Sequence, residues 1–397
     1  MPLNIPDSLI EPKPAISHVA AKRIVVLSQH YYSSKRKANF HFLSEAFADL
    51  GYDVTFVTVQ ISPVSWLRKR DSRTCPQLWN EAGKLIQKRP NLKSFVWLTP
   101  FHIFSLRSKI ADHLSTPLSY LYGHWPLGQM RKSILQADLF LFESTGGILL
   151  MDRFRKMNPD AAYVYRPSDN LRHLGAHQAI VTAEERLLSQ FHFISSPSQE
   201  MCERAKKYSN VAFHPHGIDK IIFSQKFENP YPADSRTCAV SIGSAFFDYD
   251  FLRIAAQSLP DWAFHILGNV ARTGTAPNIF YHGEIPFEQT IPYLHHAHVG
   301  LAAYRNQPEA KGLVDSSLKL TQYTWCRLPS VAPAYCMRAD RPHIFGYDLS
   351  RPETIREALL AARNHNRHTI QRDEIDSWKG LATKILTHLP GKFATSD

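Results

Sequence analysis

The first sixty positions alternate between apolar runs and an amphipathic stretch, in the order strand, helix, strand. Arg23–Ser28 is an apolar run of strand length, and Tyr52–Val59 is rich in β-branched and aromatic residues. Between them, Asn39–Leu50 has the spacing of an amphipathic helix, which Gly51 ends. The apolar face of this helix consists of Phe40, Leu43, Phe47 and Leu50. This strand–helix–strand order predicts a parallel sheet, because neighbouring parallel strands need a crossover connection, which is usually a helix.

The pattern continues along the chain and restarts after a hinge at Phe213–Asp219, where Pro215 and Gly217 interrupt regular structure. Further strands are predicted at 94–98, 139–143, 162–165, 191–195, 238–242, 263–267, 279–281 and 299–303. Further helices are predicted at 148–157, 183–189, 249–258, 287–296, 316–326, 352–365 and 373–389. The fold class is therefore α/β, with two doubly wound αβα domains that face each other across a cleft.

Four segments follow from this pattern. Residues 1–20 are expected to form a flexible leader, and residues 21–215 an N-terminal domain. Residues 216–375 are expected to form the second domain, and residues 376–397 a C-terminal helix that packs back on the first domain.

Composition narrows the class of protein. The 397 residues are 44% hydrophobic and 20% charged, which excludes intrinsic disorder for the bulk of the chain. No apolar run approaches the roughly 18 residues of a membrane-spanning helix, and the N-terminus lacks the pattern of a signal peptide. The five cysteines are scattered and form no CxxC pair, which indicates a reducing compartment. We therefore expect a cytosolic protein.

The excess of positive charge lies almost entirely in the first half. Residues 1–215 hold 27 Lys and Arg against 17 Asp and Glu, whereas residues 216–397 hold 19 against 18. Trp66–Lys132 alone has 12 basic residues against three acidic ones, interleaved with aromatic residues. This composition suits binding to an anionic membrane surface. The alternative is that the aromatic residues lie in the core and the cations around them are solvated. The candidates for membrane or acceptor contact are Trp66, Arg68, Lys69, Arg70 and Trp97.

Loops that follow the first-domain strands carry candidate chemistry. The loop 29–38 lacks the G-x-G-x-x-G of a dinucleotide site and instead carries Lys35, Arg36 and Lys37. These cations form either a solvated basic loop or a contact to phosphate or anionic lipid. Asp169 follows another strand, where it either takes a proton from a sugar hydroxyl or caps a following helix. The small residues of Glu143–Gly147 suit a ligand at a helix N-terminus, or a plain strand–helix turn.

The second domain offers a more coherent site. Ser316 or Ser317 begins a helix whose free N–H groups and dipole suit a diphosphate, and Lys319 and Gln322 lie on its first turns. An ordinary capped surface helix is the alternative. The loop at Gly243–Ser244 and the carboxylate of Glu284 follow two strands, where they suit a diphosphate and a ribose diol. His295, His296 and His298 lack the i, i+4 spacing of ligands, so no metal site is expected.

Several stretches together resemble the GumK-type β-glucuronosyltransferases of xanthan-like exopolysaccharide biosynthesis, which are two-domain GT-B glycosyltransferases. They occur in the family's order over roughly residues 22–335. In the first half they are V-L-S-Q-H and K-R-K-A-N-F-H-F, F-E-S, N-P-D-A-A-Y-V-Y-R-P-S-D-N-L and H-P-H-G-I-D. In the second half they are V-S-I-G-S-A-F-F-D, H-G-E, G-L-A-A-Y and D-S-S-L-K-L-T-Q-Y.

This resemblance implies an inverting, metal-independent transfer of glucuronate from UDP-glucuronate, without a cofactor. The implied acceptor is a polyprenyl-diphosphate-linked oligosaccharide at the inner face of the cytoplasmic membrane, which the protein binds peripherally. Asp169 matches the general base of the family. The positions that match its UDP-sugar contacts are Ser244, Glu284, Tyr304, Ser317, Lys319 and Gln322. Lys319 alternatively contacts the glucuronate carboxylate.

The chain departs from the family at Ala245, Ile285 and Leu318, where the prototype has methionine in the nucleotide site. These residues stay apolar but change volume, which leaves another UDP-sugar donor as an alternative. A second alternative is a membrane-surface binding protein without catalysis. Nucleic-acid binding is disfavoured, because no RNP, KH or zinc-finger pattern accompanies the charge.

Overall fold

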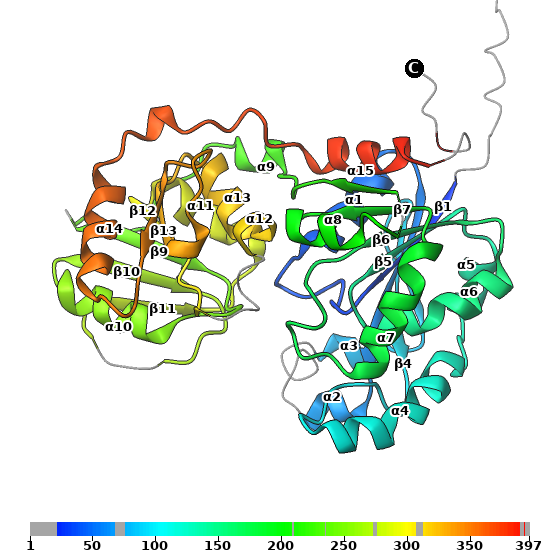
Figure 1. The fold of residues 1–397 in the computed structure, drawn as a ribbon. Coiled ribbons are helices and arrows are strands. Elements are labelled where there is room, and N and C mark those ends of the chain that lie inside the picture. Colours follow the sequence, from blue (N-terminus) through cyan, green and yellow to red (C-terminus); the bar gives the residue numbers. More distant parts are fainter. Residues whose placement is uncertain are drawn as a thin grey trace, which may run out of the picture.

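Two sheets, each covered by helices on both faces, form the two lobes of the molecule (Figure 1). The computed structural model describes residues 22–67, 76–208, 210–234, 236–272, 276–306, 313–389 and 393. The expectation of two Rossmann-like αβα domains is confirmed. No helix in the described part of the chain is long and apolar enough to cross a membrane.

The N-terminal sheet has eight strands in the order β3-β4-β2-β1-β5-β6-β7-β8. All neighbours are parallel except β3, which runs antiparallel to β4. The central strand β1 alternates between the two faces, as its pleat requires. Val25 and Leu27 enter one core cluster, and Ile24 and Val26 enter the other. The strands are β1 (Arg23–Ser28), β2 (Asp53–Ile61), β3 (Leu85–Arg89), β4 (Leu92–Leu98), β5 (Leu139–Glu143), β6 (Ala162–Arg166), β7 (Phe193–Ser196) and β8 (Val211–Phe213).

Helices cover both faces of this sheet. One face carries α1 (Asn39–Asp49), and the other carries α4 (Lys109–His124), α5 (Met130–Leu135), α6 (Met151–Met157) and α7 (Gln178–Leu187). The remaining short helices are α2 (Pro63–Leu67), α3 (Gln77–Glu81), the 3-10 turns η1 (Gly146–Leu150) and η2 (Leu188–Gln190), and α8 (Gln199–Ala205).

The second sheet has six parallel strands in the order β11-β10-β9-β12-β13-β14. They are β9 (Thr237–Ile242), β10 (Trp262–Leu267), β11 (Ile279–Gly283), β12 (Val299–Leu301), β13 (Ser330–Pro333) and β14 (Ile344–Tyr347). One face packs against α11 (Phe287–His296) and α13 (Leu318–Trp325), the other against α10 (Tyr249–Ser258) and α14 (Glu353–Asn364). Short elements are α9 (Lys220–Phe223), α12 (Leu313–Ser316), η4 (Ala334–Cys336) and η5 (Arg367–Thr369).

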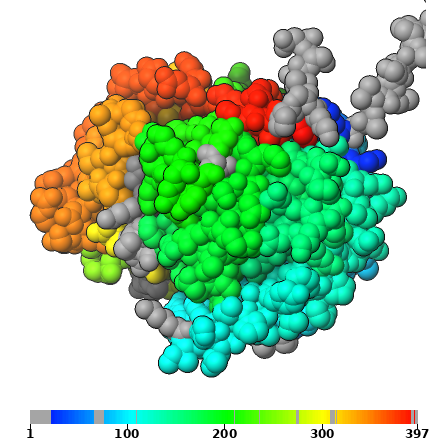
Figure 2. Space-filling view, turned by 45° about the vertical axis from the view of Figure 1, so that its right-hand side comes forward, coloured from blue at the N-terminus to red at the C-terminus, as the bar shows by residue number. Residues whose placement is uncertain are grey.

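The chain crosses between the domains twice. The first crossing follows β8, and the second leads from α14 to α15 (Trp378–Thr387), which lies on the N-terminal domain (Figures 1 and 2). Leu381 and Ile385 of α15 join the same core cluster as Ile24 of β1. The two crossings pair with each other, because the Ile218 N–H donates to the Asp376 carbonyl at 2.9 Å.

Candidate functional site

A cavity of about 290 Å³ lies between the two domains and is lined by residues of both. Its walls come from the loops after β1, β5, β6, β9, β10 and β11, from Tyr304 beyond β12, and from the start of α13. These loops leave the carboxyl ends of parallel strands, where ligands of open α/β sheets bind.

Asp169 lies on the N-terminal side of this cavity, three residues beyond β6. Its backbone N–H and that of Ser168 both donate to Ser144 Oγ, at 3.1 and 3.0 Å. A turn follows, and the next helix begins only at Gln178 with His177 as its N-cap. The alternative in which Asp169 caps a helix is therefore wrong. Burial, followed by the charge of Glu143, raises the pKa of Asp169 to about 6, which suits a general base.

The basic loop of residues 29–38, which follows β1, contacts the C-terminal domain. Lys37 pairs with Glu45 of α1 at 2.9 Å and with Glu288 of α11 at 3.7 Å. The Lys35 carbonyl accepts a hydrogen bond from Phe287 N at 3.3 Å. Arg36 lines the cavity with these two lysines. The loop is thus part of the cleft and not a wholly solvated segment.

Ser317 opens α13 on the opposite side of the cavity. Its Oγ accepts a hydrogen bond from Leu320 N at 3.1 Å, so the predicted helix cap is confirmed. The Tyr304 hydroxyl lies 2.6 Å from the same Oγ. Gln322 is buried one turn later and also lines the cavity.

Lys319 extends from the first turn of α13 into the cavity. Its Nζ lies 3.5 Å from Ser241 Oγ and 5.0 Å from the centre of the Tyr304 ring. Burial, followed by the positive charge of Arg36, lowers the pKa of Lys319 to about 7. Among the described residues, no carboxylate lies within ion-pair distance of Lys319 or Arg36. The cavity therefore has positive charge on both walls that suits an anionic ligand.

The remaining donor-side candidates lie in the same cavity. Ser244 follows Gly243, whose positive φ of 75° suits glycine, and Glu284 follows β11. The three departures from the family, Ala245, Ile285 and Leu318, line it too. The structure thus brings together Asp169, Lys35, Arg36, Lys37, Ser244, Glu284, Tyr304, Ser317, Lys319 and Gln322.

The family model of glucuronosyltransferase GumK, N-terminal domain, matches residues 26–197. These residues form a GumK-type N-terminal domain. The resemblance found in the sequence is confirmed by this match and by a relative of the whole chain. The chain is 25% identical over 379 residues to UDP-glucuronate:glycolipid 2-beta-glucuronosyltransferase of Xanthomonas campestris pv. campestris. That match covers 95% of this chain and 92% of the relative.

Solved structures show the fold. Sucrose-phosphate synthase of Thermosynechococcus elongatus matches with a TM-score of 0.60 at 14% identity, over 92% of this chain and 97% of that one. Trehalose 6-phosphate synthase of Burkholderia multivorans matches with a TM-score of 0.55 at 11% identity, over 93% and 98%. Both are glycosyltransferases of the GT-B fold, so the fold class expected from the sequence is confirmed.

The expected membrane-facing residues have mixed outcomes. Arg68, Lys69 and Arg70 lie outside the described residues, as does the side chain of Trp66 in α2. The expectation that Trp97 faces a membrane is wrong. It is only 1% exposed and packs edge-on against Tyr122, and its Nε1–H donates to the Pro126 carbonyl at 3.0 Å.

Most of the exposed apolar residues described in this region lie instead on α4, a helix that the sequence reasoning missed. Its stripe consists of Ile110, Leu114, Leu118 and Leu121, which are 74%, 74%, 41% and 52% exposed. The spacing i, i+4, i+8, i+11 is the signal of one helix face. Pro117 within the helix, with the polar residues around it, hid that signal.

Glu143 is a further feature of the site to which the sequence reasoning assigned no role. It ends β5, is 2% exposed and lines the cavity beside Asp169. A carboxylate at the end of an otherwise apolar strand is a signal that was available in the sequence. Among the described residues, no group of three His, Cys, Asp or Glu side chains is placed to hold a metal ion.

Proposed function

We propose that this protein is an inverting glucuronosyltransferase, which transfers glucuronate from UDP-glucuronate to a polyprenyl-diphosphate-linked oligosaccharide. The observation that carries the proposal is the opposition of Asp169 and Lys319 across one cavity. One domain supplies a carboxylate whose pKa is raised to about 6. The other supplies a capped helix start with a cation, Lys319, that has no carboxylate partner among the described residues. A base and an anion site on opposite walls suit displacement of a nucleotide from a sugar.

The proposed reaction is a single displacement. Asp169 takes the proton of an acceptor hydroxyl, whose oxygen attacks the anomeric carbon of the donor sugar. The bond between that carbon and the diphosphate oxygen breaks, and UDP leaves with the electron pair from the opposite face. The N–H groups at the start of α13 and the charge of Lys319 stabilise the leaving diphosphate. Attack opposite the leaving group inverts the anomeric centre.

The choice of donor rests on the relative and on charge. The Xanthomonas relative is named for transfer of glucuronate from UDP-glucuronate to a glycolipid. UDP-glucuronate carries a sugar carboxylate besides its two phosphates. Lys35 and Arg36 add positive charge to the cavity beyond that of Lys319, which suits this third anion. We expect no metal requirement, so chelation with EDTA should leave the turnover unchanged.

The test is a product analysis with purified protein, a membrane lipid extract and a set of UDP-sugars. Transfer from UDP-glucuronate should exceed transfer from UDP-glucose and UDP-galactose by at least about tenfold, and equal turnover would contradict the choice of donor. Asp169→Asn should lower turnover by about 10²- to 10⁴-fold and leave the donor affinity unchanged. Retained turnover in that variant would remove Asp169 from the base role, and no turnover in the wild-type protein would favour a binding protein without catalysis.

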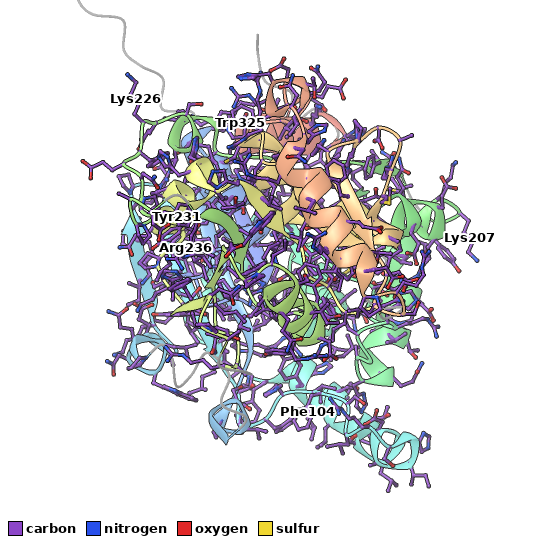
Figure 3. The ribbon with its side chains drawn as sticks, turned by 90° about the vertical axis from the view of Figure 1, so that its left-hand side faces the viewer. Phe104, Lys207, Lys226, Tyr231, Arg236 and Trp325 are labelled. Atoms are coloured by element: carbon purple, nitrogen blue, oxygen red, sulfur yellow. The ribbon has the colours of Figure 1, made fainter. Side chains whose placement is uncertain are left out.

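We further propose that α4 seats the protein on the cytoplasmic face of an anionic membrane. Its exposed stripe lies at an end of the N-terminal domain, near Phe104, that extends away from the C-terminal domain (Figure 3). The exposed cation Arg107 lies two residues before the start of α4. Burying an aliphatic side chain is worth about 1.5–3 kcal/mol, and each cation near an anionic surface adds about 1 kcal/mol.

Vesicle sedimentation tests this surface. Phosphatidylglycerol-containing vesicles should retain the wild-type protein, and the double variant Ile110→Glu, Leu114→Glu should bind at least about tenfold more weakly. Ile221→Glu is the matched control, because Ile221 is 78% exposed on α9, far along the chain from this stripe. Equal loss in both variants, or equal binding to neutral vesicles at high salt, would contradict the role of α4.

A further inference from the structure

We infer that Glu143 is a positioning residue of the transfer reaction, which holds the loop of Asp169 in place and whose negative charge makes Asp169 a stronger base. The inference rests on the proposed function of Asp169. Glu143 itself takes no proton from the substrate in this scheme. The proton of the acceptor hydroxyl goes to Asp169, and Glu143 stays charged throughout the step.

Hydrogen bonds from three donors converge on the Glu143 carboxylate. Oε2 accepts from Ser28 Oγ at 2.6 Å and from Gln29 N at 3.2 Å, both at the end of β1. Oε1 accepts from Ser168 Oγ at 2.8 Å, in the loop after β6. One buried side chain thus joins the ends of three neighbouring strands, β1, β5 and β6.

The network continues into the loop that carries Asp169. Ser168 Oγ also accepts a hydrogen bond from Asn39 Nδ2 at 3.0 Å, which adds the start of α1. Ser144, the residue after Glu143, accepts from the backbone of Ser168 and Asp169. The backbone of Asp169 is therefore held by the pair Glu143–Ser144. Its carboxylate, by contrast, has no hydrogen-bond partner among the described residues and is left to face the cavity.

Burial raises the pKa of Glu143, and the hydrogen bonds from Ser28, Ser168 and Gln29 oppose this effect by favouring the charged carboxylate. Burial is the largest effect that raises the pKa of Asp169, and the negative charge of Glu143 is the second. The positive charge of Arg36 lowers this pKa. His30 lies closest to the pair, with its Nε2 3.9 Å from Glu143 Oε1. The other titratable groups described in the cavities that Asp169 lines are Lys35, Lys37, His173, Glu200, His216, Glu284, Tyr304 and Lys319. Because base catalysis strengthens with basicity, the charge of Glu143 favours the transfer at neutral pH.

The test compares the pH dependence of kcat/KM in three forms of the full-length protein. Glu143→Gln keeps the shape of the side chain and removes its charge, so the acid limb should move to lower pH by about one unit. The plateau should fall roughly two- to fivefold, because a weaker base remains. Ser168→Ala is the matched control, since it removes one hydrogen bond and keeps the charge. It should lower kcat without moving the acid limb.

An unchanged acid limb in Glu143→Gln would overturn the inference, and so would an equal shift in Ser168→Ala. Should Glu143→Gln fail to fold, Glu143→Asp serves as the second variant. It keeps the charge, so its acid limb should stay within about 0.3 pH units of the wild type, and a larger shift would again overturn the inference. Absence of transfer by the wild-type protein with every UDP-sugar rejects the proposed function instead, so the two failures are distinguishable.

Discussion

Lys319, as a proposed donor contact, should make the affinity for the donor depend on pH. Its pKa is lowered to about 7 in the free protein, because the side chain is buried beside another cation, Arg36. A bound diphosphate reverses this effect, since it favours the charged ammonium. Donor binding should therefore take up a proton wherever the free protein has lost it, that is, above pH 7 and not below pH 6.

The size of the effect follows from the protonated fraction. At pH 8 about one tenth of the free protein carries a charged Lys319, so the apparent Kd should be about tenfold higher than at pH 6. At pH 9 the increase should reach about 100-fold, with about 1.4 kcal/mol for each factor of ten. These factors hold as long as the pKa of Lys319 in the complex lies above the pH of the measurement.

Isothermal titration calorimetry with UDP-glucuronate, without acceptor, measures both quantities. Titrations between pH 6 and 9 give the Kd, and buffers of different ionisation enthalpy give the number of protons taken up. That number should approach one near pH 8.5. Lys319→Arg is the matched control, because guanidinium does not titrate in this range, and its Kd should be nearly independent of pH.

A flat Kd between pH 7 and 9 in the wild-type protein would refute the reasoning. It would mean either that Lys319 stays charged in the free protein or that it does not contact the donor. A pH dependence of the same size in Lys319→Arg would assign the proton to another group.

Two further predictions concern helix capping and the hinge. Ser317→Ala removes the bond to Leu320 N and the contact to Tyr304, so it should weaken donor binding by about tenfold in calorimetry, while Tyr304→Phe, which leaves the cap intact, should weaken it less. Equal losses of donor affinity in the two variants would contradict a role of the Ser317 helix cap in donor binding. Gly217→Ala places a Cβ 2.8 Å from Trp378 N and should lower the free energy of unfolding in urea by about 1–3 kcal/mol. Gly380→Ala, in a helix position with room for a Cβ, should be neutral or stabilising, and destabilisation of both variants alike would contradict the steric argument.

The buried central strands of the sheet could be predicted from the sequence, because burial in the core explains why their residues are apolar. In β1, five of six residues are buried, and in β5 all five are, so uninterrupted apolar runs identify them. The edge strand β3 has no fully buried residue and reads as a polar loop. Its pairing with β4 depends on contacts that a local pattern does not contain.

The candidate site was predictable where function and local structure use the same residues. Ser317 caps a helix and also lines the cavity at the proposed anion site, so a capping pattern leads to it. Trp97 shows the opposite case. Its indole suits a membrane interface as well as a core, and only the neighbours Tyr122 and Pro126 decide between them. The role inferred for Glu143 likewise depends on β1, β5 and β6 being adjacent, which the order of strands along the chain does not reveal.

The paired crossings determine how the two domains can move. His216–Ile218 and Asp376–Trp378 run side by side, held by Ile218 N to the Asp376 carbonyl at 2.9 Å and by Trp378 N to the Ile218 carbonyl at 3.3 Å. Sliding or twisting one domain on the other would shear this pair, whereas rotation about its long axis preserves it. A rotation about this axis that opens the cavity would move Asp169 away from Lys319 and the Lys35 carbonyl away from Phe287 N at the same time. In the proposed reaction, one degree of freedom would then govern both the release of UDP and the alignment of the base with the acceptor.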